Sequence, residues 1–260
     1  MNLPLSAIII TLNEERNIQQ CLDSVRFCDE IIVVDSGSDD KTVEIATAFG
    51  AKVIAQEWLG YGPQKQFAVE QANNDWVLCI DADEVVSSQL ALSITSLDLT
   101  VRSTVAYKMP RKNHFLGKAL HHGEGYPDLS LRLFHRSNNR WSNDKVHEGV
   151  ITLNGKADTL TGDLLHFSEE TLSHYISKQN QYTLLQAQAL FTQGKYCSPI
   201  KCFTSPFTRF VKFYFFRLGF LDGAAGFIHI TIGCFNAFCK YAKLLELQRH
   251  TPSHQRVNND

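Results

Sequence analysis

Two aspartates at the end of an apolar run are the residues in this chain whose types and spacing best suit chemistry. Residues 76–80 are mostly apolar, and Asp81 and Asp83 follow them directly. Such a run predicts a buried strand, and alternate side chains of an extended segment point to the same side. Two carboxylates so placed are hard oxygen ligands, which suit Mg²⁺ or Mn²⁺ carrying a phosphate. The alternative interpretation is a strand that ends in an acidic loop.

The segments before this run alternate between strand and helix patterns. Predicted strands cover 5–11, 30–35, 52–55 and 76–80, and predicted helices cover about 13–27, about 41–49 and the segment that starts at Gly62-Pro63. Near-continuous apolar strands joined by helices predict an α/β fold, a Rossmann-like and mostly parallel sheet with helices on both faces. Because ligands bind at the carboxyl ends of the strands in such sheets, we expect the site at the edge that carries Asp81.

The pattern changes after residue 90. Alternating apolar and polar residues at 105–109 and 129–134 predict antiparallel strands. The segment 117–127 is rich in Gly, His and Pro and predicts a loop that forms one wall of a site. A further strand is expected within 146–153, and a helix over about 169–193.

The composition narrows the classes of function. A formal net charge of −2 and a pI near 6.5 give no support for nucleic-acid binding. Seven cysteines without a CxxC pair favour reduced thiols and a cytosolic compartment. The first residues lack the basic segment, apolar core and small-residue cleavage site of a signal peptide. We therefore expect a cytoplasmic protein.

Residues 199–247 combine aromatic and basic side chains. Phenylalanines and tyrosines are interleaved with lysines and arginines up to residue 217, and residues 223–239 contain no Asp, Glu, Lys or Arg. That uncharged stretch is shorter than a confident membrane span. The mixture predicts helices that lie on a membrane surface; the alternative is a helix pair packed on the domain or in a dimer interface. The polar residues 248–260 are expected to form a disordered tail.

Three ordered motifs resemble the family 2 glycosyltransferases of GT-A fold. They are SAIIITLNEE at 6–15, IIVVDSGSDDKT at 31–42 and DADE at 81–84. The later segments YPD at 126–128, RLF at 132–134, VHEG at 146–149 and GFLDG at 219–223 resemble the branch that adds sugars, often glucose, to the heptose inner core of bacterial lipopolysaccharide. The chain also lacks GxGxxG in its first strand–helix turn and has no GxxxxGK[ST], which argues against a dinucleotide dehydrogenase and a P-loop NTPase.

The resemblance implies a nucleotide-sugar donor, usually a UDP-sugar, a divalent metal and inversion at the anomeric carbon. Carried over position by position, it implies a nucleoside pocket lined by Thr11, Glu14 and Asp35, with Lys65 beside it. Asp81 would approach the ribose and the metal, and Asp83 would be the direct metal ligand. The acceptor would be a lipid-anchored core oligosaccharide at the cytoplasmic face of the inner membrane, with the enzyme peripheral on that surface.

The same resemblance suggests how the chain is organised. We expect a nucleotide-sugar-binding half at 1–90 and an acceptor-side half of the same catalytic domain at 91–198. A membrane-associating region would follow at 199–247, before the tail at 248–260.

An inverting transfer also needs a carboxylate base, because the acceptor hydroxyl loses its proton as it attacks. Glu148 is favoured for its place in the VHEG motif, and Asp128 is the rival, which would otherwise position the acceptor. His166 is a candidate third metal ligand, or a core histidine bonded to backbone, the commoner role for a lone histidine. Arg132 is expected either to contact the acceptor or to pair with a carboxylate.

Two other classes of function fit parts of the pattern. An apolar strand ending in Asp-x-Asp also marks haloacid-dehalogenase-type phosphatases, in which the first aspartate is a nucleophile. There the motif comes near the N-terminus, whereas here it follows the fourth strand. The second alternative is a non-catalytic module that binds nucleotide-sugars or the membrane, in which neither Glu148 nor Asp128 would matter for function.

Overall fold

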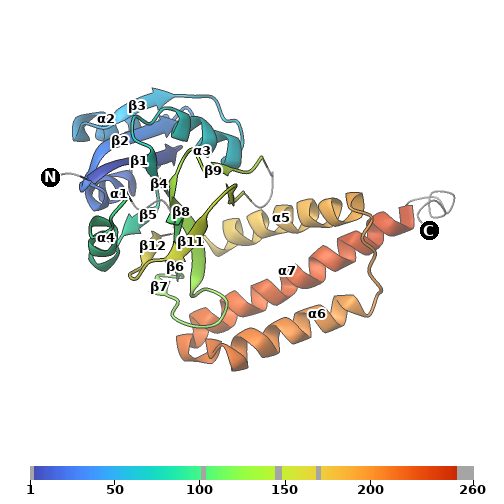
Figure 1. Ribbon diagram of the computed structural model, residues 1–260. Coiled ribbons are helices and arrows are strands. Elements are labelled where there is room, and N and C mark those ends of the chain that lie inside the picture. The colour runs from blue at the N-terminus through green and yellow to red at the C-terminus, as the bar shows by residue number, and fades with distance from the viewer. Residues whose placement is uncertain (1–2, 101–103, 144–147, 168–170, 251–260) are drawn as a thin grey trace. The chain divides into compact units, whose positions relative to one another are not determined.

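A computed structural model describes residues 3–100, 104–143, 148–167 and 171–250 of the chain. The chain falls into two compact units. The first comprises Met1–His114 and Pro127–Ser168, and the second comprises Phe115–Tyr126 and Glu169–Asp260. Figure 1 labels the helices and strands of both units.

The first unit is built on a sheet whose strands run in the order β3-β2-β1-β4-β8-β6-β12-β5. These strands are β1 (Leu3–Thr11), β2 (Cys28–Asp35), β3 (Lys52–Ala55), β4 (Trp76–Asp81), β5 (Glu84–Val86), β6 (Thr104–Phe115), β8 (Asp128–His135) and β12 (Leu164–Phe167). The first four in the order are mutually parallel, β8 is antiparallel to both of its neighbours, and β12 is parallel to β6. The predicted α/β sheet is confirmed.

Both faces of the parallel strands are buried, because apolar side chains point alternately to each face. Along β1, Ala7 and Ile9 belong to one apolar cluster, whereas Ile8 and Ile10 belong to the other. The first cluster receives side chains from α1 (Ile18–Ser24), α2 (Thr42–Phe49) and α4 (Ser88–Thr95), and the second receives them from α3 (Tyr61–Glu70). Helices therefore cover both faces, and polar side chains collect at the strand ends.

The first helix begins later than the sequence pattern predicts. α1 starts at Ile18, and Asn13, where the predicted helix begins, has a positive φ of 56° and cannot be part of a right-handed helix. The Asn13 N–H donates to Ser38 Oγ at 2.8 Å, and Asn13 Oδ1 accepts a hydrogen bond from the N–H of Asp39 at 2.9 Å. These bonds tie the loop after β1 to the loop after β2, which holds two neighbouring strand ends in place.

The second half of this unit has more strands than the sequence predicts. β6 continues to Phe115, well beyond the expected 105–109, and within the expected 146–153 the strand β10 spans Val150–Thr152. Residues 144–147 lie outside the described residues. The short strands β9 (Asn139–Trp141), β11 (Lys156–Thr159), β12 and β5 lack a pattern long enough to be recognised.

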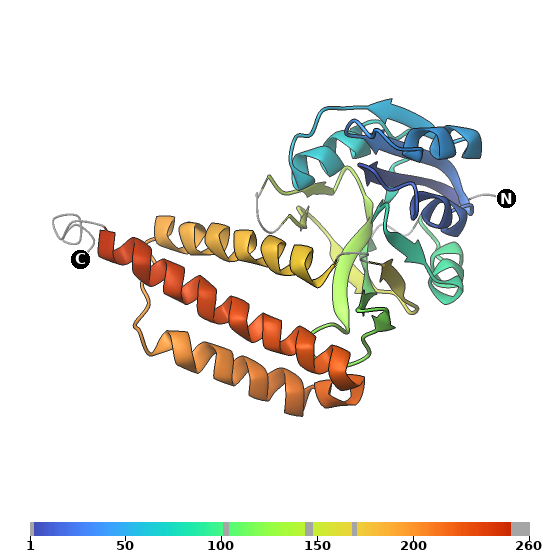
Figure 2. The same cartoon turned by 180° about the vertical axis from the view of Figure 1, so that it is seen from behind.

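The second unit is mainly helical. Its elements are β7 (Lys118–Ala119), α5 (Leu172–Thr192), α6 (Lys201–Phe210), the π-helical η1 (Val211–Phe216), the 3₁₀ turn η2 (Gly219–Asp222) and α7 (Gly223–His250). Figures 1 and 2 show α7 lying between α5 and α6. Among the described residues, no single helix has the length and apolar character of a membrane span; 201–216 and 219–249 pass that test only as a pair, bent by 75°. Most of the tail expected after 247 lies outside the described residues.

Within the second unit, the loop segment 115–126 is fixed to the helices by polar contacts. Asp222 accepts hydrogen bonds from the backbone N–H groups of His121 at 3.1 Å and His122 at 2.9 Å, and its Oδ1 lies 2.9 Å from His122 Nδ1. Arg209 Nε donates to a Glu124 carboxylate oxygen at 3.0 Å. The GFLDG motif, which ends with Asp222 and Gly223, thus anchors the loop that the sequence predicts as a site wall.

Candidate active site

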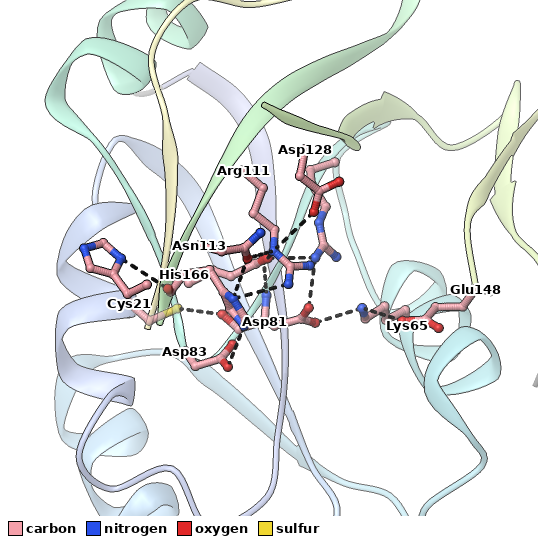
Figure 3. Close-up of polar contacts among 12 residues, drawn as sticks. Cys21, Lys65, Asp81, Asp83, Arg111, Asn113, Asp128, Glu148 and His166 are labelled. Carbon is pink, nitrogen blue, oxygen red and sulfur yellow. Dashed lines mark hydrogen bonds and ion pairs between the residues drawn. The ribbon is translucent and has the colours of Figure 1, made fainter. Parts of the chain in front are cut away.

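Asp81, the last residue of β4, is held between two cations (Figure 3). Lys65 Nζ, on α3, lies 2.9 Å from Asp81 Oδ1, and a terminal nitrogen of Arg132, on β8, lies 2.9 Å from Asp81 Oδ2. Removal from water opposes the charged form of this carboxyl, but the two cations outweigh it and hold the pKa of Asp81 well below its usual value. Asp81 is therefore a fixed carboxylate, and each of its oxygens faces a cation.

Glu84 is the buried centre of the same group of charges. Its side chain is fully buried, its Oε2 accepts the backbone N–H of Asp81 at 2.9 Å, and its Oε1 accepts Arg132 at 2.8 Å. Arg111 Nε, on β6, lies 3.6 Å from the same oxygen. A buried carboxylate with these partners fixes the turn that carries both aspartates. The sequence prediction assigned Glu84 no role, although its place directly after the Asp-x-Asp pair is a usable signal.

Asp83 faces His166 on the other side of that turn. Asp83 Oδ2 lies 3.1 Å from His166 Nε2, and the two side chains are 25% and 18% exposed. β12 brings His166 to this position by pairing with β5 on one side and β6 on the other, which aligns His166 with Glu84 and with Asn113. The Phe167 N–H also donates to the Asp83 carbonyl oxygen at 2.9 Å.

The Asp83–His166 pair fits a divalent cation. Ligands in neighbouring positions of an octahedron with bonds of about 2.1 Å lie about 3.0 Å apart, close to the separation of these two atoms. A carboxylate suits Mn²⁺ or Mg²⁺, and the imidazole favours Mn²⁺ of the two; phosphate and water would supply the other ligands. In the part of the chain that the structure describes, no group of three or more His, Cys, Asp and Glu side chains surrounds a common point. The remaining ligands would have to come from a bound diphosphate or water.

The two candidate bases each contact a cation of this network. Glu148 Oε1 lies 3.7 Å from Lys65 Nζ, and Asp128 Oδ2 lies 3.9 Å from Arg111 Nε. Lys65 is almost fully buried, with its ammonium 4.8 Å from the centre of the Trp141 ring. Lys65 thus bridges Asp81 and Glu148 (Figure 3). Asp128 is connected to Asp81 less directly, through Arg111 and then Glu84.

The residues predicted to line a nucleoside pocket lie at the ends of β1 and β2 and in the loop after β1. Thr11 and Asp35 are register partners on these strands, and both are buried. Asp35 accepts the N–H groups of Gly37 and Ser38 at 2.9 Å each, so its carboxylate shapes the loop after β2. Glu14 Oε2 accepts the side-chain amide of Asn17 at 2.8 Å. Among the described atoms the buried Thr11 hydroxyl has no hydrogen-bond partner, which leaves it available to a ligand.

Comparison with known proteins identifies the family of this chain. The family model described as glycosyl transferase family 2 matches residues 6–150. The lipopolysaccharide core biosynthesis glycosyltransferase LpsC of Rhizobium meliloti is 34% identical over 95% of this chain and 93% of its own length. The chain belongs to glycosyl transferase family 2. An uncharacterized glycosyltransferase of Rickettsia typhi is 35% identical to this family 2 enzyme over 94% of this chain and 87% of its own.

Solved structures agree on the fold. Glucosyl-3-phosphoglycerate synthase of Mycobacterium tuberculosis, crystallised with Mn²⁺, UDP and glucosyl-3-phosphoglycerate, superimposes with a TM-score of 0.50. The alignment covers 75% of this chain and 81% of the synthase at 19% identity, so the likeness concerns the GT-A fold alone.

Membership of this glycosyltransferase family shows that the phosphatase alternative is wrong. It also supports an enzyme over a non-catalytic module. The structure brings Lys65, Asp81, Asp83, Glu148, Asp128 and His166 into one set of contacts, and keeps Thr11, Glu14 and Asp35 at the neighbouring strand ends. Lys65, expected beside the nucleoside pocket, contacts Asp81 and Glu148. Arg132 pairs with the carboxylates of Asp81 and Glu84, one of its two expected roles.

Proposed function

We propose that this glycosyltransferase moves glucose from UDP-glucose to the inner core of lipopolysaccharide, with inversion at the anomeric carbon. The observation that carries the donor side is the Asp83–His166 pair, 3.1 Å apart, beside the cation-held Asp81 at the end of β4. The acceptor class rests on the likeness to LpsC along nearly the whole of both chains. The glucose donor is supported by the UDP-glucose complex of the synthase that shares this fold.

Each residue of the site would have its own role in the transfer of the sugar. The acceptor oxygen forms its bond to the anomeric carbon as the bond between that carbon and the diphosphate oxygen breaks. Glu148 takes the proton of the attacking hydroxyl, and Lys65, in contact with both Glu148 and Asp81, holds the base relative to the donor side. Asp83 and His166 would hold Mn²⁺ or Mg²⁺, which when bound supplies positive charge to the departing UDP.

Asp128 takes the second role that the sequence leaves open. Its carboxylate, 45% exposed and 3.9 Å from Arg111, accepts hydrogen bonds from acceptor hydroxyls and positions the sugar. We favour Glu148 as the base because its contact with Lys65 connects it to Asp81 through one side chain.

The enzyme is further proposed to act as a peripheral protein on the cytoplasmic face of the inner membrane. Several large apolar side chains of residues 203–221 are exposed to water, and we call them the aromatic surface: Phe203, Phe207, Phe215, Phe216, Leu218, Phe220 and Leu221. Residues 199–221 also contain four basic residues and no acidic ones: Lys201, Arg209, Lys212 and Arg217. Exposed aromatic groups flanked by positive charge suit a surface of anionic lipid, where a lipid-anchored acceptor would be found.

The proposed reaction is tested with lipopolysaccharide truncated after its heptose residues as the acceptor. With radiolabelled UDP-glucose and Mn²⁺ the label should enter the acceptor, and EDTA should stop the transfer. UDP-galactose and GDP-mannose serve as competing donors, and NMR of the product should show the anomeric configuration opposite to that of the donor. Transfer from UDP-galactose or GDP-mannose in preference to UDP-glucose, or retained configuration, would contradict the proposal.

A further inference from the structure

His166 has neighbours on both ring nitrogens, and they determine where its proton lies. Nε2 faces Asp83 Oδ2 at 3.1 Å. Nδ1 lies 2.9 Å from Asn113 Oδ1 and 3.2 Å from a terminal nitrogen of Arg111 (Figure 3). A neutral imidazole carries one N–H, so Nδ1 either donates to the amide oxygen or accepts from the guanidinium.

The contact between Arg111 and Asn113 indicates which of these two roles Nδ1 has, because it fixes the orientation of the Asn113 amide. The Arg111 Nε–H donates to Asn113 Oδ1 at 3.1 Å, and a guanidinium has only donors, so the oxygen of the amide must face it. The same oxygen is the nearer of the two neighbours of His166 Nδ1. Nδ1 therefore donates to Asn113. Arg111 itself is kept in place by Glu84 and Asp128, at 3.6 and 3.9 Å.

We propose that Asn113 is a positioning residue that stabilises the proton of His166 on Nδ1 and so makes the Nε2 lone pair available to a cation beside Asp83. This inference rests on the proposed metal-assisted function. A histidine that binds a metal through one nitrogen usually donates its other N–H to a fixed acceptor, and such acceptors contribute to metal affinity. The pairing of β12 with β6 places Asn113 directly opposite His166, so the acceptor belongs to the sheet itself.

The same contacts define the arrangement that Asn113 prevents. Without the amide oxygen, the Arg111 terminal N–H can donate to Nδ1 across 3.2 Å, and Nε2–H can donate to Asp83 across 3.1 Å. That tautomer satisfies both neighbours while it blocks the nitrogen that would bind a cation. Asp83 and Asn113 thus compete for the proton of a neutral His166, and only the tautomer with the proton on Nδ1, which Asn113 favours, can serve as a ligand.

The test uses the full chain and begins without metal. Long-range ¹H–¹⁵N NMR reports which ring nitrogen of neutral His166 carries the proton, and the H166Q variant identifies its signals. Because Asp83 accepts at Nε2 and Asn113 accepts at Nδ1, we expect a larger fraction of Nδ1–H in the wild type and in N113D, which keeps an acceptor, than in N113A. A change of tautomer is a result that loss of packing alone does not produce. N113L, close to asparagine in size and also without an acceptor, replaces N113A if that variant does not fold.

The second measurement is Mn²⁺ affinity in the presence of UDP, followed by electron paramagnetic resonance. N113A should bind Mn²⁺ about 10- to 100-fold more weakly, whereas N113D should retain tight binding. N73A is the matched control, because Asn73 is an exposed asparagine of the same unit, close to the opposite end of β4. Unchanged affinity and an unchanged Nδ1–H signal in N113A would overturn the inference and leave the proposed function standing. A wild type that binds no Mn²⁺ with UDP would overturn the metal-assisted function and, with it, the role of Asn113 in metal binding.

Discussion

The site at the end of β4 and the aromatic surface of the helical unit differ in which kind of side chain they bury and which they expose to water. At the site, charged side chains are buried and paired: Glu84 is fully buried and Lys65 is 3% exposed. On the aromatic surface, apolar side chains face water, with Phe203 73% and Phe216 81% exposed. Buried pairs have their positions fixed before any ligand arrives, because each charge depends on its partner. Covering exposed aromatic groups lowers the free energy, which is the basis of the membrane binding proposed for that surface.

The largest effect expected at the prearranged site comes from removing its proposed metal ligand. D83A should lower the transfer rate about 10⁴-fold, because a metal supplies several kcal/mol of charge stabilisation and about 1.4 kcal/mol corresponds to a factor of ten. Radiolabel transfer under saturating donor measures this loss. D75A is the control, since Asp75 is a largely exposed aspartate just before the start of β4. Near-normal activity of D83A with an intact fold would remove the proposed mechanism.

A smaller loss distinguishes the two candidate bases of the same site. E148Q should lower kcat about 10³-fold, because general base catalysis contributes about 10²- to 10⁴-fold. D128N should mainly raise KM for the acceptor, since it loses hydrogen bonds that hold the sugar. Steady-state kinetics with varied acceptor separates these effects. The reverse result, a collapse of kcat in D128N with E148Q nearly active, would assign the base to Asp128.

The sequence predicts the scaffold of this site better than its contacts. Apolar strands that end in polar residues predict the parallel sheet and place Asp81 and Asp83 at its carboxyl edge, because strand periodicity is local information. The pairing of Asn113 with His166 depends on β12 entering the sheet between β6 and β5. Such short strands carry little periodic signal, and their register is set by partners distant in the chain.

Burial of charge is equally hard to predict from the sequence. Glu84 belongs to a residue type that is almost never fully buried unless it is paired, and its partners Arg132 and Arg111 are brought to it by two different strands. Asn13 is a second case in which the sequence misleads. Asparagine is a typical helix-capping residue, but here Asn13 takes a left-handed conformation, which its hydrogen bonds to the loop after β2 stabilise. In both cases tertiary contacts outweigh the local preference.

Acid should loosen the helical unit before it protonates Asp81. Burial, with help from the charge of Arg209, lowers the pKa of His229 from its usual 6.5 to about 4. Between these values the unfolded chain binds a proton that the folded chain does not, so stability falls as the pH falls from 6.5 to 4. The pKa of Asp81 is lowered too, but a carboxyl of this kind loses its stabilising effect only as the pH falls below its usual 3.8.

Urea unfolding at several pH values measures this difference. His229 should account for roughly 2–3 kcal/mol of the stability lost between pH 6.5 and 4, at about 1.4 kcal/mol for each pKa unit. H229F should reduce that loss, because phenylalanine fits between Phe115 and Tyr175 and does not titrate. H121Q, which removes an exposed imidazole of the same unit, controls for loss of a histidine as such. An unchanged pH dependence in H229F would show that His229 is not the group responsible.

The smallest effects are expected for substitutions on the aromatic surface, and they test whether lipid or a second copy of the chain covers it. F207S and F216S should each weaken binding to vesicles of anionic lipid about tenfold, because burying a phenylalanine contributes roughly 1.5–3 kcal/mol and partial insertion gives part of that. Co-sedimentation with vesicles measures the binding. L92S is the matched control, since Leu92 is 71% exposed but lies on α4 of the first unit.

The same variants separate a lipid surface from a second copy of the chain. If lipid covers the aromatic surface, K212Q should also weaken binding, by about fivefold at the ~1 kcal/mol that each basic residue contributes near an anionic membrane, and added salt should reduce that difference. A second copy would instead make the effect of F207S depend on protein concentration and appear as dissociation of a dimer in analytical ultracentrifugation. Loss of a dimer in F207S with unchanged vesicle binding would mean that the exposed aromatic groups serve self-association. The contrast between the two regions would then be one between a site for substrates and a contact between subunits.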